Sequence, residues 1–336
     1  MNLIAHHMTI EDCLGSFLGT VALDVAINSG LIAALASDAR ADPHPAPLAA
    51  ILRAIGVLKS DDFALTDGFA ALWQTQSSQL RARVGFLRLA AADVALHAED
   101  LFHDTHRFME ESSTFQYFDY GLAMRDDPVA RAHTQRWVDY VAALTDAEAP
   151  GLLDVVALPD TGLVLEIGGN AGAFARHVLL RHPGLSYAIL DLPGVCALGR
   201  DDPENARFGD RLRFLPGDMH RMNWRMETGR APDVILFKSV LHDWPAEQAA
   251  ELLARAARYL APSGRIVILE RGAHTSANLP EIPFSSSANL VFSAFYREPD
   301  LYASALRTAW PAAQVTIRPV LLDMRWFVTT AMEHKR

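Results

Sequence analysis

Residues 164–172 read Val-Leu-Glu-Ile-Gly-Gly-Asn-Ala-Gly, an apolar run that leads directly into a glycine-rich turn. The apolar run predicts a buried strand, and the residues from Ala173 onward predict a helix. Glycine allows the backbone to turn sharply and to approach a ligand without a clash at Cβ, and the first N–H groups of the following helix are free to bind it. Strand, glycine turn and helix in this order are typical of the cofactor-binding end of a Rossmann-like unit. Because the turn does not read G-x-G-x-x-G, it does not favour a dinucleotide.

The alternation of strand and helix continues beyond this turn to the end of the chain. The further segments that we expect are strands at 187–190, 212–215, 234–237, 265–269, 315–317 and 325–330, and helices at 245–260 and 300–310. Strands that alternate with helices predict an α/β fold with a doubly wound, mostly parallel sheet. We place this Rossmann-like domain, with seven strands, in residues 151–336.

The part of the chain before residue 151 reads as helices. In residues 1–95 apolar side chains recur at helical intervals, the short amphipathic segment Leu48–Ile55 ends at Gly56, and Val57–Thr66 has the pattern of a small β-hairpin with an Asp-rich turn. Helix, helix and hairpin form a winged-helix pattern, which taken alone suggests DNA binding. Residues 96–150 are expected to be a helical linker. The aromatic residues near its middle either belong to the core or wall a substrate pocket.

The composition is that of a globular protein and disfavours a nucleic-acid partner. The 336 residues carry 30 Lys and Arg against 40 Asp and Glu, a formal net charge of −10, and they contain no dense basic cluster of the kind that nucleic-acid binders use. We find no signal-peptide pattern and no run of about 18 apolar residues, so we expect a cytoplasmic protein without a membrane segment. The two distant cysteines, Cys13 and Cys196, are expected to be buried, reduced thiols.

Three polar positions follow the ends of expected strands, where ligands bind in open α/β sheets. Asp191 comes about 20 residues after the glycine turn and can accept hydrogen bonds from two ribose hydroxyls; the alternative is that it caps the next helix. Asp218 can take an adenine amino group while Met219 packs on the ring, although Gly-Asp is also an ordinary turn. His242 lies just past the fourth strand, where it can act as a base or be merely structural.

Five motifs carry a resemblance to a known family. They read Val164–Gly172, Leu190-Asp-Leu-Pro-Gly-Val, Gly217-Asp-Met, Phe237-Lys-Ser-Val-Leu-His-Asp-Trp and Gly264-Arg-Ile-Val-Ile-Leu-Glu-Arg. In order and spacing they resemble the small-molecule O-methyltransferases of the caffeate and hydroxyneurosporene type. The resemblance extends over essentially the whole chain, because that family carries an N-terminal winged-helix dimerisation domain.

The resemblance implies an S-adenosylmethionine-dependent methyltransferase that acts on a small molecule, foremost at a hydroxyl oxygen, and that forms a homodimer through its N-terminal domain. It implies His242 as the general base and Glu270 as the carboxylate that orients and polarises it. It implies no metal. The cofactor contacts that it implies are Gly168, Gly172, Asp191, Leu192, Asp218, Met219 and Lys238.

Three positions depart from the pattern of that family. Asn170 stands in place of a third glycine, and Glu166 stands in place of an aspartate. The second glutamate that flanks the histidine in the family is absent, and its expected position is Leu301. Tyr296 and Arg297 are therefore expected to reshape the pocket.

A base flanked by one carboxylate leaves other chemistries open. Transfer to sulfur, nitrogen or carbon is one alternative, because a thioether acceptor needs no base. Non-methylation chemistry with the same cofactor is a second alternative, disfavoured because His242 and Glu270 are both present; a winged-helix regulator that senses the cofactor is a third, disfavoured by the acidic charge. The identity of the acceptor stays open, because the shape of the pocket depends on the segments around 100–140 and 285–300. Arg297 or Arg136 either binds an acidic substrate or is simply solvated.

Overall fold

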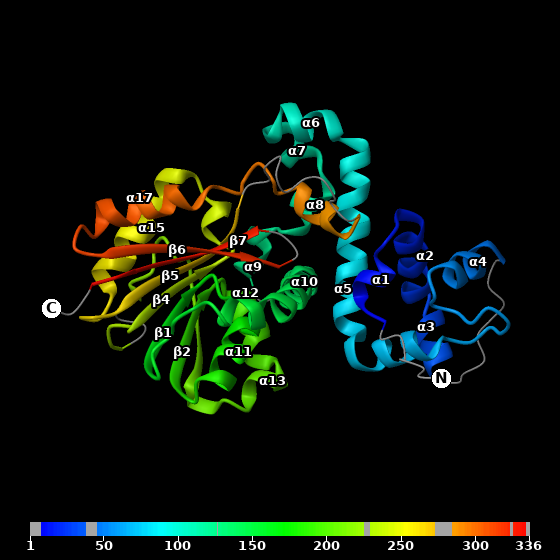
Figure 1. The fold of residues 1–336 in the computed structure, drawn as a ribbon, viewed down its shortest axis with the longest axis horizontal. Helices are drawn as coiled ribbons and strands as arrows, with labels where there is room; N and C mark the ends of the chain where they lie inside the picture. The colour runs from blue at the N-terminus through cyan, green and yellow to red at the C-terminus, as the bar shows by residue number, and fades with distance from the viewer. Residues whose placement is uncertain are drawn as a thin grey trace. The chain divides into compact units, whose positions relative to one another are not determined.

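The computed structural model describes residues 8–37, 46–125, 127–224, 229–272, 284–322 and 325–333 (Figure 1). These residues form two compact units. The described residues of Met1–Tyr117 and Glu281–Val291 make up the N-terminal unit, and those of Phe118–Pro280 and Phe292–Arg336 make up the C-terminal unit. Each unit has its own buried apolar interior.

The N-terminal unit is built from helices. They are α1 (Ile10–Cys13), α2 (Phe17–Asn28), α3 (Leu31–Ala36), α4 (Ala46–Ala54), α5 (Asp67–Leu96), α6 (Ala98–His103), α7 (Thr105–Glu111), α8 (Ser113–Tyr117), the 3₁₀ turn η3 (Phe284–Ser286) and α16 (Ser287–Leu290). The long helix α5 packs against α2 and against α16, which comes from a distant part of the sequence. Thr66 begins α5: its hydroxyl accepts the N–H of Phe69 (3.3 Å) and donates to the carbonyl of Gly56 (2.6 Å).

The local features predicted for residues 1–95 are present. The expected helix at Leu48–Ile55 is α4, and Gly56 follows it in the left-handed region, with φ +73°. The expected hairpin is short, with one antiparallel bridge between Leu58 and Leu65. The winged-helix interpretation of this pattern, and its role in dimerisation, stay predictions.

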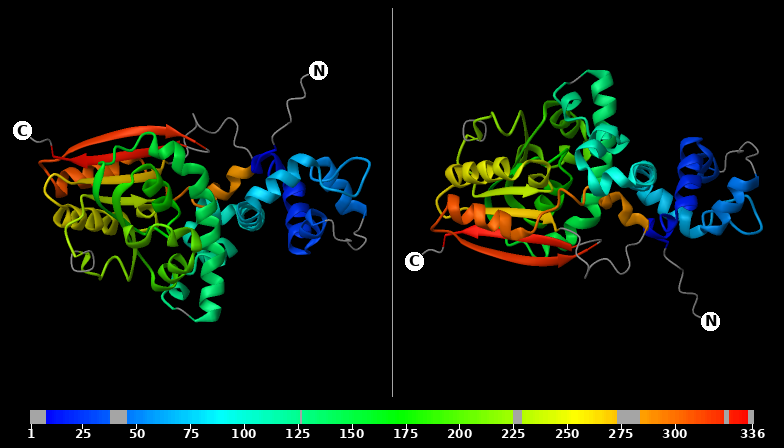
Figure 2. Two further views of the ribbon diagram at one scale, coloured as in Figure 1. Left: turned by 90° about the horizontal axis from the view of Figure 1, so that it is seen from below. Right: turned by 90° about the horizontal axis from the view of Figure 1, so that it is seen from above.

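The C-terminal unit holds a seven-stranded sheet in the order β3-β2-β1-β4-β5-β7-β6. Its strands are β1 (Thr161–Ile167), β2 (Gly184–Asp191), β3 (Leu212–Pro216), β4 (Val234–Lys238), β5 (Arg265–Arg271), β6 (Gln314–Leu321) and β7 (Arg325–Met332). Strands β1 to β5 are parallel, whereas β7 runs antiparallel to both of its neighbours. The pair β6 and β7 forms one border of the sheet (Figure 2). The predicted mostly parallel, seven-stranded fold is therefore confirmed.

Helices cover both faces of this sheet, as the doubly wound interpretation requires (Figure 1). They are α9 (Tyr120–Ala123), α10 (Pro128–Leu153), α11 (Ala173–Arg181), α12 (Pro193–Asp201), α13 (Pro203–Ala206), α15 (Ala246–Tyr259) and α17 (Pro299–Ala309), with the 3₁₀ turns η1 (Gly209–Arg211) and η2 (Leu241–Asp243). Val164 belongs to the core formed with α10 and α11, and its neighbour Leu165 belongs to the core formed with α15 and α17. This alternation is the two-residue period of a strand that is buried on both faces.

The strand order places a crevice beside β1. From β1 the chain moves outward to β2 and β3 on one side, and it then returns to β4 and β5 on the other side. Helices on the two sides leave the sheet in opposite directions at such a reversal, so ligands bind outside the carboxyl ends of the central strands.

Two further expectations concern the membrane and the thiols. Over the stretches of chain described above, no helix is both long and apolar enough to cross a bilayer. Cys13 and Cys196 are free and buried, as predicted. Burial raises the pKa of each thiol to about 12, so both are unreactive as nucleophiles near neutral pH.

Candidate active site

A cavity of about 360 Å³ lies at the carboxyl ends of the central strands of the C-terminal unit. Side chains from β1, β2 and β4 and from the turns that follow them form its floor, and α9 and α10 contribute a wall. Its aromatic and large apolar lining residues are Phe118, Tyr120, Met124, Trp137, Val141, Phe174, Leu190, Leu192, Met219, Val240 and Trp244. Its polar lining residues are Thr145, Glu166, Asn170, Asp191, Asp218, Lys238, Ser239 and Asp243. An apolar cavity with a few polar groups is typical of a small-molecule site.

The glycine turn after β1 approaches this cavity closely. Gly168 has φ +69°, and a Cβ on it would lie 2.6 Å from Val240 Cγ2, so only glycine fits there. Asn170 also adopts a left-handed conformation, with φ +55°, where the family pattern has a third glycine. Gly172 has φ +95° and begins α11. Gly172 does not line the cavity, whereas Gly168 and Asn170 do.

Asp191 ends β2 and faces the same cavity. Its carboxylate accepts the backbone N–H groups of Asn170 and Leu192, each at 2.7 Å. It does not cap α12, because the N-cap of that helix is Leu192. Desolvation raises the pKa of Asp191 to about 6. A carboxylate in this position can still accept hydrogen bonds from hydroxyl groups of a ligand.

Asp218 and Met219 follow β3 and line the cavity together with Trp244. Asp218 Oδ1 accepts the backbone N–H of His220 at 2.8 Å, and the ring of His220 meets that of Trp244 with centroids 4.4 Å apart. Arg255 donates to the carbonyl of Met219 at 2.6 Å and so fixes this turn. The thioether and the indole give this part of the wall flat, apolar surfaces that suit a planar ring.

Lys238 lines the cavity at the end of β4, but its ammonium group points into a buried ion cluster. Its Nζ lies 3.1 Å from both Thr145 Oγ1 and Glu148 Oε2, and 5.2 Å from the centre of the Trp326 ring. Arg271 pairs with the other carboxylate oxygen of Glu148 and covers the same ring at 4.2 Å. The charged side chains of this cluster are at most 7% exposed. They join α10 to the ends of β4 and β5.

Removing the carboxylate of this cluster should destabilise the fold. In the variant Glu148→Gln, the ammonium and guanidinium groups of Lys238 and Arg271 would stay buried without the charge of Glu148, and removing one partner of a buried ion pair typically costs about 3–5 kcal/mol. Urea unfolding measures the loss of free energy. The matched control Glu298→Gln removes the carboxylate from a more exposed pair with Arg325 and should cost less than about 1 kcal/mol. Equal losses in the two variants would contradict the role of the cluster.

His242 lies in η2, shortly after β4, and Glu270 is the last residue but one of the neighbouring strand β5. They are 8% and 2% exposed. Glu270 Oε2 lies 2.7 Å from His242 Nδ1. Glu270 Oε1 accepts the backbone N–H groups of Val240 (3.0 Å), Leu241 (2.8 Å) and His242 (3.4 Å). One carboxylate therefore holds both the imidazole and the turn that carries it.

Charge and burial oppose each other at this pair. Burial by itself lowers the pKa of His242, but the carboxylates of Glu270 and Asp243 outweigh it, so the pKa is raised above its usual value. Burial by itself raises the pKa of Glu270, but His242 and the backbone N–H groups outweigh it, so that pKa is lowered. The pair is therefore an ionised carboxylate beside an imidazole that binds a proton readily.

The second nitrogen of the imidazole faces the edge of the cavity. His242 Nε2 lies 3.3 Å from Asp243 Oδ1, and Asp243 Oδ2 accepts the phenol O–H of Tyr120 at 2.9 Å. Asp243 and Tyr120 line the cavity, although His242 itself does not. The structure thus brings Nε2 next to a side chain that contacts the cavity.

The residue expected to replace the second family glutamate is not beside His242. Leu301 is 37% exposed on α17 and does not line the cavity. Instead Tyr296 meets the imidazole edge to face, with ring centroids 5.3 Å apart. Arg297 donates to backbone carbonyls of the turn around His242, and Arg136 is exposed away from the cavity lining. Tyr296 reaches the imidazole because the chain approaches it before α17 begins, and the correspondence of Leu301 to the family glutamate stays a prediction.

Sequence reasoning missed the buried ion cluster and the pair formed by Tyr120 and Asp243. Glu148 gave one available signal, since it is a carboxylate within the apolar stripe of α10 that includes Ala149 and Leu152. A charged residue on a buried helix face needs a partner. Its partners lie 90 and 123 residues away in the sequence, where no local pattern identifies them.

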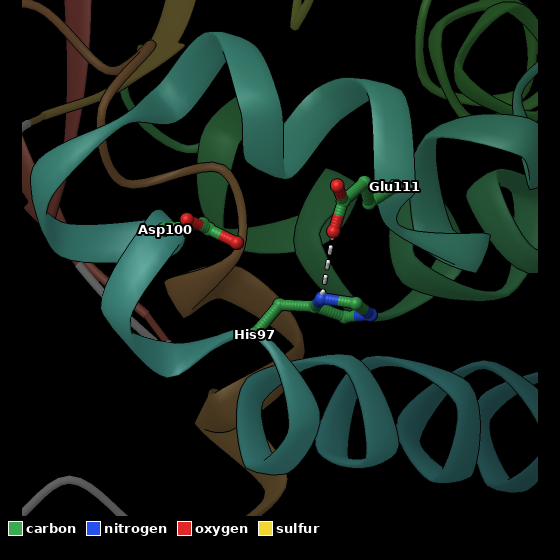
Figure 3. Close-up of side chains that lie close together, drawn as sticks. All are labelled: His97, Asp100 and Glu111. Atoms are coloured by element: carbon green, nitrogen blue, oxygen red, sulfur yellow. Dashed lines mark ion pairs between the residues drawn. The ribbon is translucent and has the colours of Figure 1, made fainter.

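One group of side chains in the described part of the chain has the composition of a metal site. His97, Asp100 and Glu111 of the N-terminal unit place their ligand atoms within 4.8 Å of one another, and His97 Nδ1 faces Glu111 at 3.7 Å (Figure 3). Arg107 Nε lies 3.1 Å from Glu111 Oε1 and 3.7 Å from Asp100 Oδ2. A guanidinium therefore already pairs with both carboxylates, and the group is better explained as a surface ion cluster.

Curated relatives that are named as O-methyltransferases match part of this chain. Demethylspheroidene O-methyltransferase of Rhodobacter capsulatus is 32% identical over 149 residues, which are 44% of this chain and 34% of that protein. Mitomycin biosynthesis 6-O-methyltransferase of Streptomyces lavendulae is 29% identical over 146 residues, which are 43% of this chain and 39% of that protein. The matched segments thus span little more than a third of the length of these relatives.

The fold and a family model extend the similarity. The solved structure of human N-acetylserotonin methyltransferase in complex with SAM is similar with a TM-score of 0.68 over 95% of both chains, at 18% identity, which shows the fold. A model of the O-methyltransferase domain matches residues 91–291, more than half of the sequence. This range contains the glycine turn, the cavity and the pair His242 and Glu270. The chain belongs to the O-methyltransferase domain family.

Proposed function

We propose that this chain transfers a methyl group from S-adenosylmethionine to a hydroxyl oxygen of a small molecule, with His242 as the general base. The observation that carries the proposal is the imidazole of His242, oriented by Glu270 at the edge of a cavity whose wall includes the glycine turn and Asp191. Relatives named as O-methyltransferases support it, as does the solved neighbour in complex with SAM. An oriented base favours a hydroxyl over a thioether, which has a lone pair without deprotonation.

The cavity wall fits this cofactor in shape and in chemistry. The missing Cβ of Gly168 leaves the turn after β1 open to a ligand, and the carboxylate of Asp191 suits the two hydroxyls of a ribose. We assign the adenine to the surfaces of Met219 and Trp244, with Leu192 and Asp218 beside them. When bound, the cofactor supplies a methyl group that its sulfonium makes electrophilic.

Two residues expected at the cofactor take indirect roles in this proposal. Gly172 does not line the cavity and acts through the shape of the turn at the start of α11. Lys238 contributes to the wall of the cavity, while its ammonium group holds α10 through Glu148. Both residues then shape the site rather than contact the cofactor through a charged or polar group.

His242 removes the proton from the acceptor. An ionised Glu270 only accepts hydrogen bonds, so the neutral imidazole carries its hydrogen on Nδ1 and its lone pair on Nε2. Burial raises the pKa of Asp243, and a protonated Asp243 beside Nε2 is compatible with this lone pair. Nε2 lies next to Asp243, so an acceptor hydroxyl that enters the cavity beside Asp243 comes within reach of it. As Nε2 takes the proton, Glu270 stabilises the positive charge of the imidazolium.

Methyl transfer is tested directly with labelled cofactor. The protein would be incubated with S-adenosylmethionine labelled in its methyl group and with panels of hydroxylated, thioether, amine and carbon acceptors. We expect a product heavier by about 14 Da, with the label on oxygen. A label on sulfur, nitrogen or carbon would overturn the hydroxyl assignment. Calorimetry that detects no heat with S-adenosylmethionine or S-adenosylhomocysteine would overturn the cofactor assignment itself.

Cofactor binding is expected to release protons and to weaken as the pH falls. Desolvation raises the pKa of Asp191 to about 6 and that of Glu166 to about 7. Near neutral pH, each carboxyl group is therefore protonated in a fraction of the free protein molecules. Ribose hydroxyls and a positive sulfonium favour the ionised carboxylates, so binding lowers both pKa values. Calorimetry near pH 6.5 in buffers of different ionisation enthalpy measures the protons released. Proton uptake, or tighter binding at lower pH, would contradict this assignment, and Asp191→Asn should reduce the release.

We also propose the organisation of the chain. Residues 1–95 would form a dimerisation domain, residues 96–150 a linker that contributes to the substrate pocket, and residues 151–336 the cofactor-binding domain. Helix α2 supports a dimer, because it exposes Phe17, Leu18 and Val25, which a second copy could cover. Light scattering that finds a monomer at micromolar concentration would contradict the dimer.

A further inference from the structure

The turn over residues 240–244 is held at its two ends by charged side chains of opposite sign. Glu270 accepts backbone N–H groups at its N-terminal end. At its C-terminal end the guanidinium of Arg297 donates to the carbonyl of Trp244 (2.5 Å). It also donates to the carbonyl of Leu241 (2.9 Å), the first residue of η2, which the N–H of Trp244 reaches as well (3.4 Å). The N–H groups and carbonyls at the ends of a short helix lack partners within it, and they favour an anion and a cation respectively. The two side chains therefore match the polarity of the turn.

Tyr296, the residue before Arg297, packs on the imidazole of His242. The two rings meet edge to face, with an interplanar angle of 76°, and Tyr296 is 6% exposed. Since Nδ1 is bonded to Glu270, the imidazole is fixed by a hydrogen bond on one edge and by ring packing elsewhere. Asp243, whose Oδ1 lies 3.3 Å from Nε2, acts on the ring through charge, whereas Tyr296 holds it by contact.

The geometry of Arg297 favours this role over the binding of an acidic substrate. Two of its donors are directed at backbone carbonyls, and its planar fork suits paired acceptors. It does not line the cavity, so its charge is not presented to a ligand there. Arg297 and Tyr296 are adjacent in sequence, and both act on the same turn from the segment that precedes α17.

We propose that Arg297 and Tyr296 are positioning residues for the base: Arg297 holds the turn that carries His242, and Tyr296 holds the imidazole by ring contact. The proposal rests on the proposed function in that His242 is taken as the base. Without Arg297 the turn is held at its N-terminal end alone. The imidazole then spends less time with Nε2 directed at the acceptor, while the glycine turn and Asp191 keep their places.

The experiment compares Arg297→Ala, Arg297→Lys and the matched control Arg265→Ala. Arg265 also donates to a backbone carbonyl, that of Ala157 at 2.7 Å, but at the start of β5 and away from the cavity. We expect kcat of Arg297→Ala to fall by about 10- to 100-fold, the loss typical of a misplaced catalytic group. The ammonium of Arg297→Lys reaches one carbonyl at a time. Its kcat should therefore lie between that of Arg297→Ala and that of the unmodified chain. The control should keep the kcat of the unmodified chain.

Two readouts separate positioning from a general loss of structure. Guanidinium chloride at a few millimolar should restore part of the kcat of Arg297→Ala. It should restore no activity to a variant that is simply unfolded. Nitrogen NMR of labelled histidines, with His242 assigned through His242→Ala, should show Nδ1–H as the main neutral form in the unmodified chain and a mixture in Arg297→Ala. Tyr296→Phe keeps the ring and should retain kcat, whereas Tyr296→Ala should lose it.

The outcomes distinguish this proposal from the proposed function. If Arg297→Ala keeps both kcat and the Nδ1–H form, or if guanidinium chloride restores nothing, the positioning role is wrong even though His242 stays the base. If His242→Ala keeps its turnover, the proposed function fails instead. The NMR comparison still reports in that case whether Arg297 orients the imidazole.

Discussion

The variant His242→Ala is expected to lose about 10²- to 10⁴-fold in kcat, the contribution typical of a positioned general base. A neutral hydroxyl is a weak nucleophile, and in the proposed mechanism its proton passes to Nε2 of His242, the imidazole that Glu270 orients. The fold should survive, because Glu270 keeps its three backbone N–H partners when the imidazole is removed. Affinity for S-adenosylhomocysteine should change little, since His242 does not line the cavity.

The control for this variant is a second pair of histidine and carboxylate in the same unit. His177 Nε2 lies 3.0 Å from Asp146 Oδ1, and both side chains are partly exposed and lie outside the cavity lining. His177→Ala should therefore keep full turnover. Steady-state rates at saturating cofactor, measured beside calorimetric affinities, separate catalysis from binding. Unchanged kcat in His242→Ala would remove this residue from the mechanism and would favour an acceptor that needs no base.

The variant Glu270→Gln is expected to lose nearly as much, about 10²- to 10⁴-fold in kcat, because it moves the hydrogen of the imidazole. The backbone N–H groups over residues 240–242 require an oxygen, so the amide oxygen of glutamine must stay with them. Its NH₂ group then faces Nδ1, which has to accept a hydrogen bond. The hydrogen of the neutral imidazole therefore shifts to Nε2, and the lone pair no longer faces the acceptor.

The loss of charge adds a second, measurable effect to Glu270→Gln. The pKa of His242 is raised in part by Glu270, so removing that carboxylate should lower it. The base is active only when deprotonated, so the acidic limb of the rate profile should shift to lower pH while the plateau falls. Nitrogen NMR of the imidazole would show the change of tautomer. The matched control Asp146→Asn should alter neither the plateau nor the limb, and an unshifted limb in Glu270→Gln would contradict the assigned partnership.

The sequence by itself determined the elements of this fold and the identities of the pair at its centre. Strand and helix patterns depend on neighbours within a few residues, so the seven strands followed from alternation and apolar runs. Gly168 and Asp191 were recognisable because a strand end, a tight turn and a carboxylate about 20 residues later form a local pattern with a fixed geometry. His242 was recognisable at the end of a strand, and Glu270 was implied by the resemblance to a family; parallel pairing of β4 and β5 brings both to one edge of the sheet.

Only the tertiary structure decided which side chains complete the site. Glu148 meets Lys238 and Arg271 across 90 and 123 residues of sequence, and Arg297 reaches the turn of His242 from 56 residues away. Tyr296 rather than Leu301 meets the imidazole, although both lie in the same short segment. Strand order and the path of the chain before α17 set these contacts. A local sequence pattern does not encode them, because it specifies the face of an element and not the partner that the face will meet.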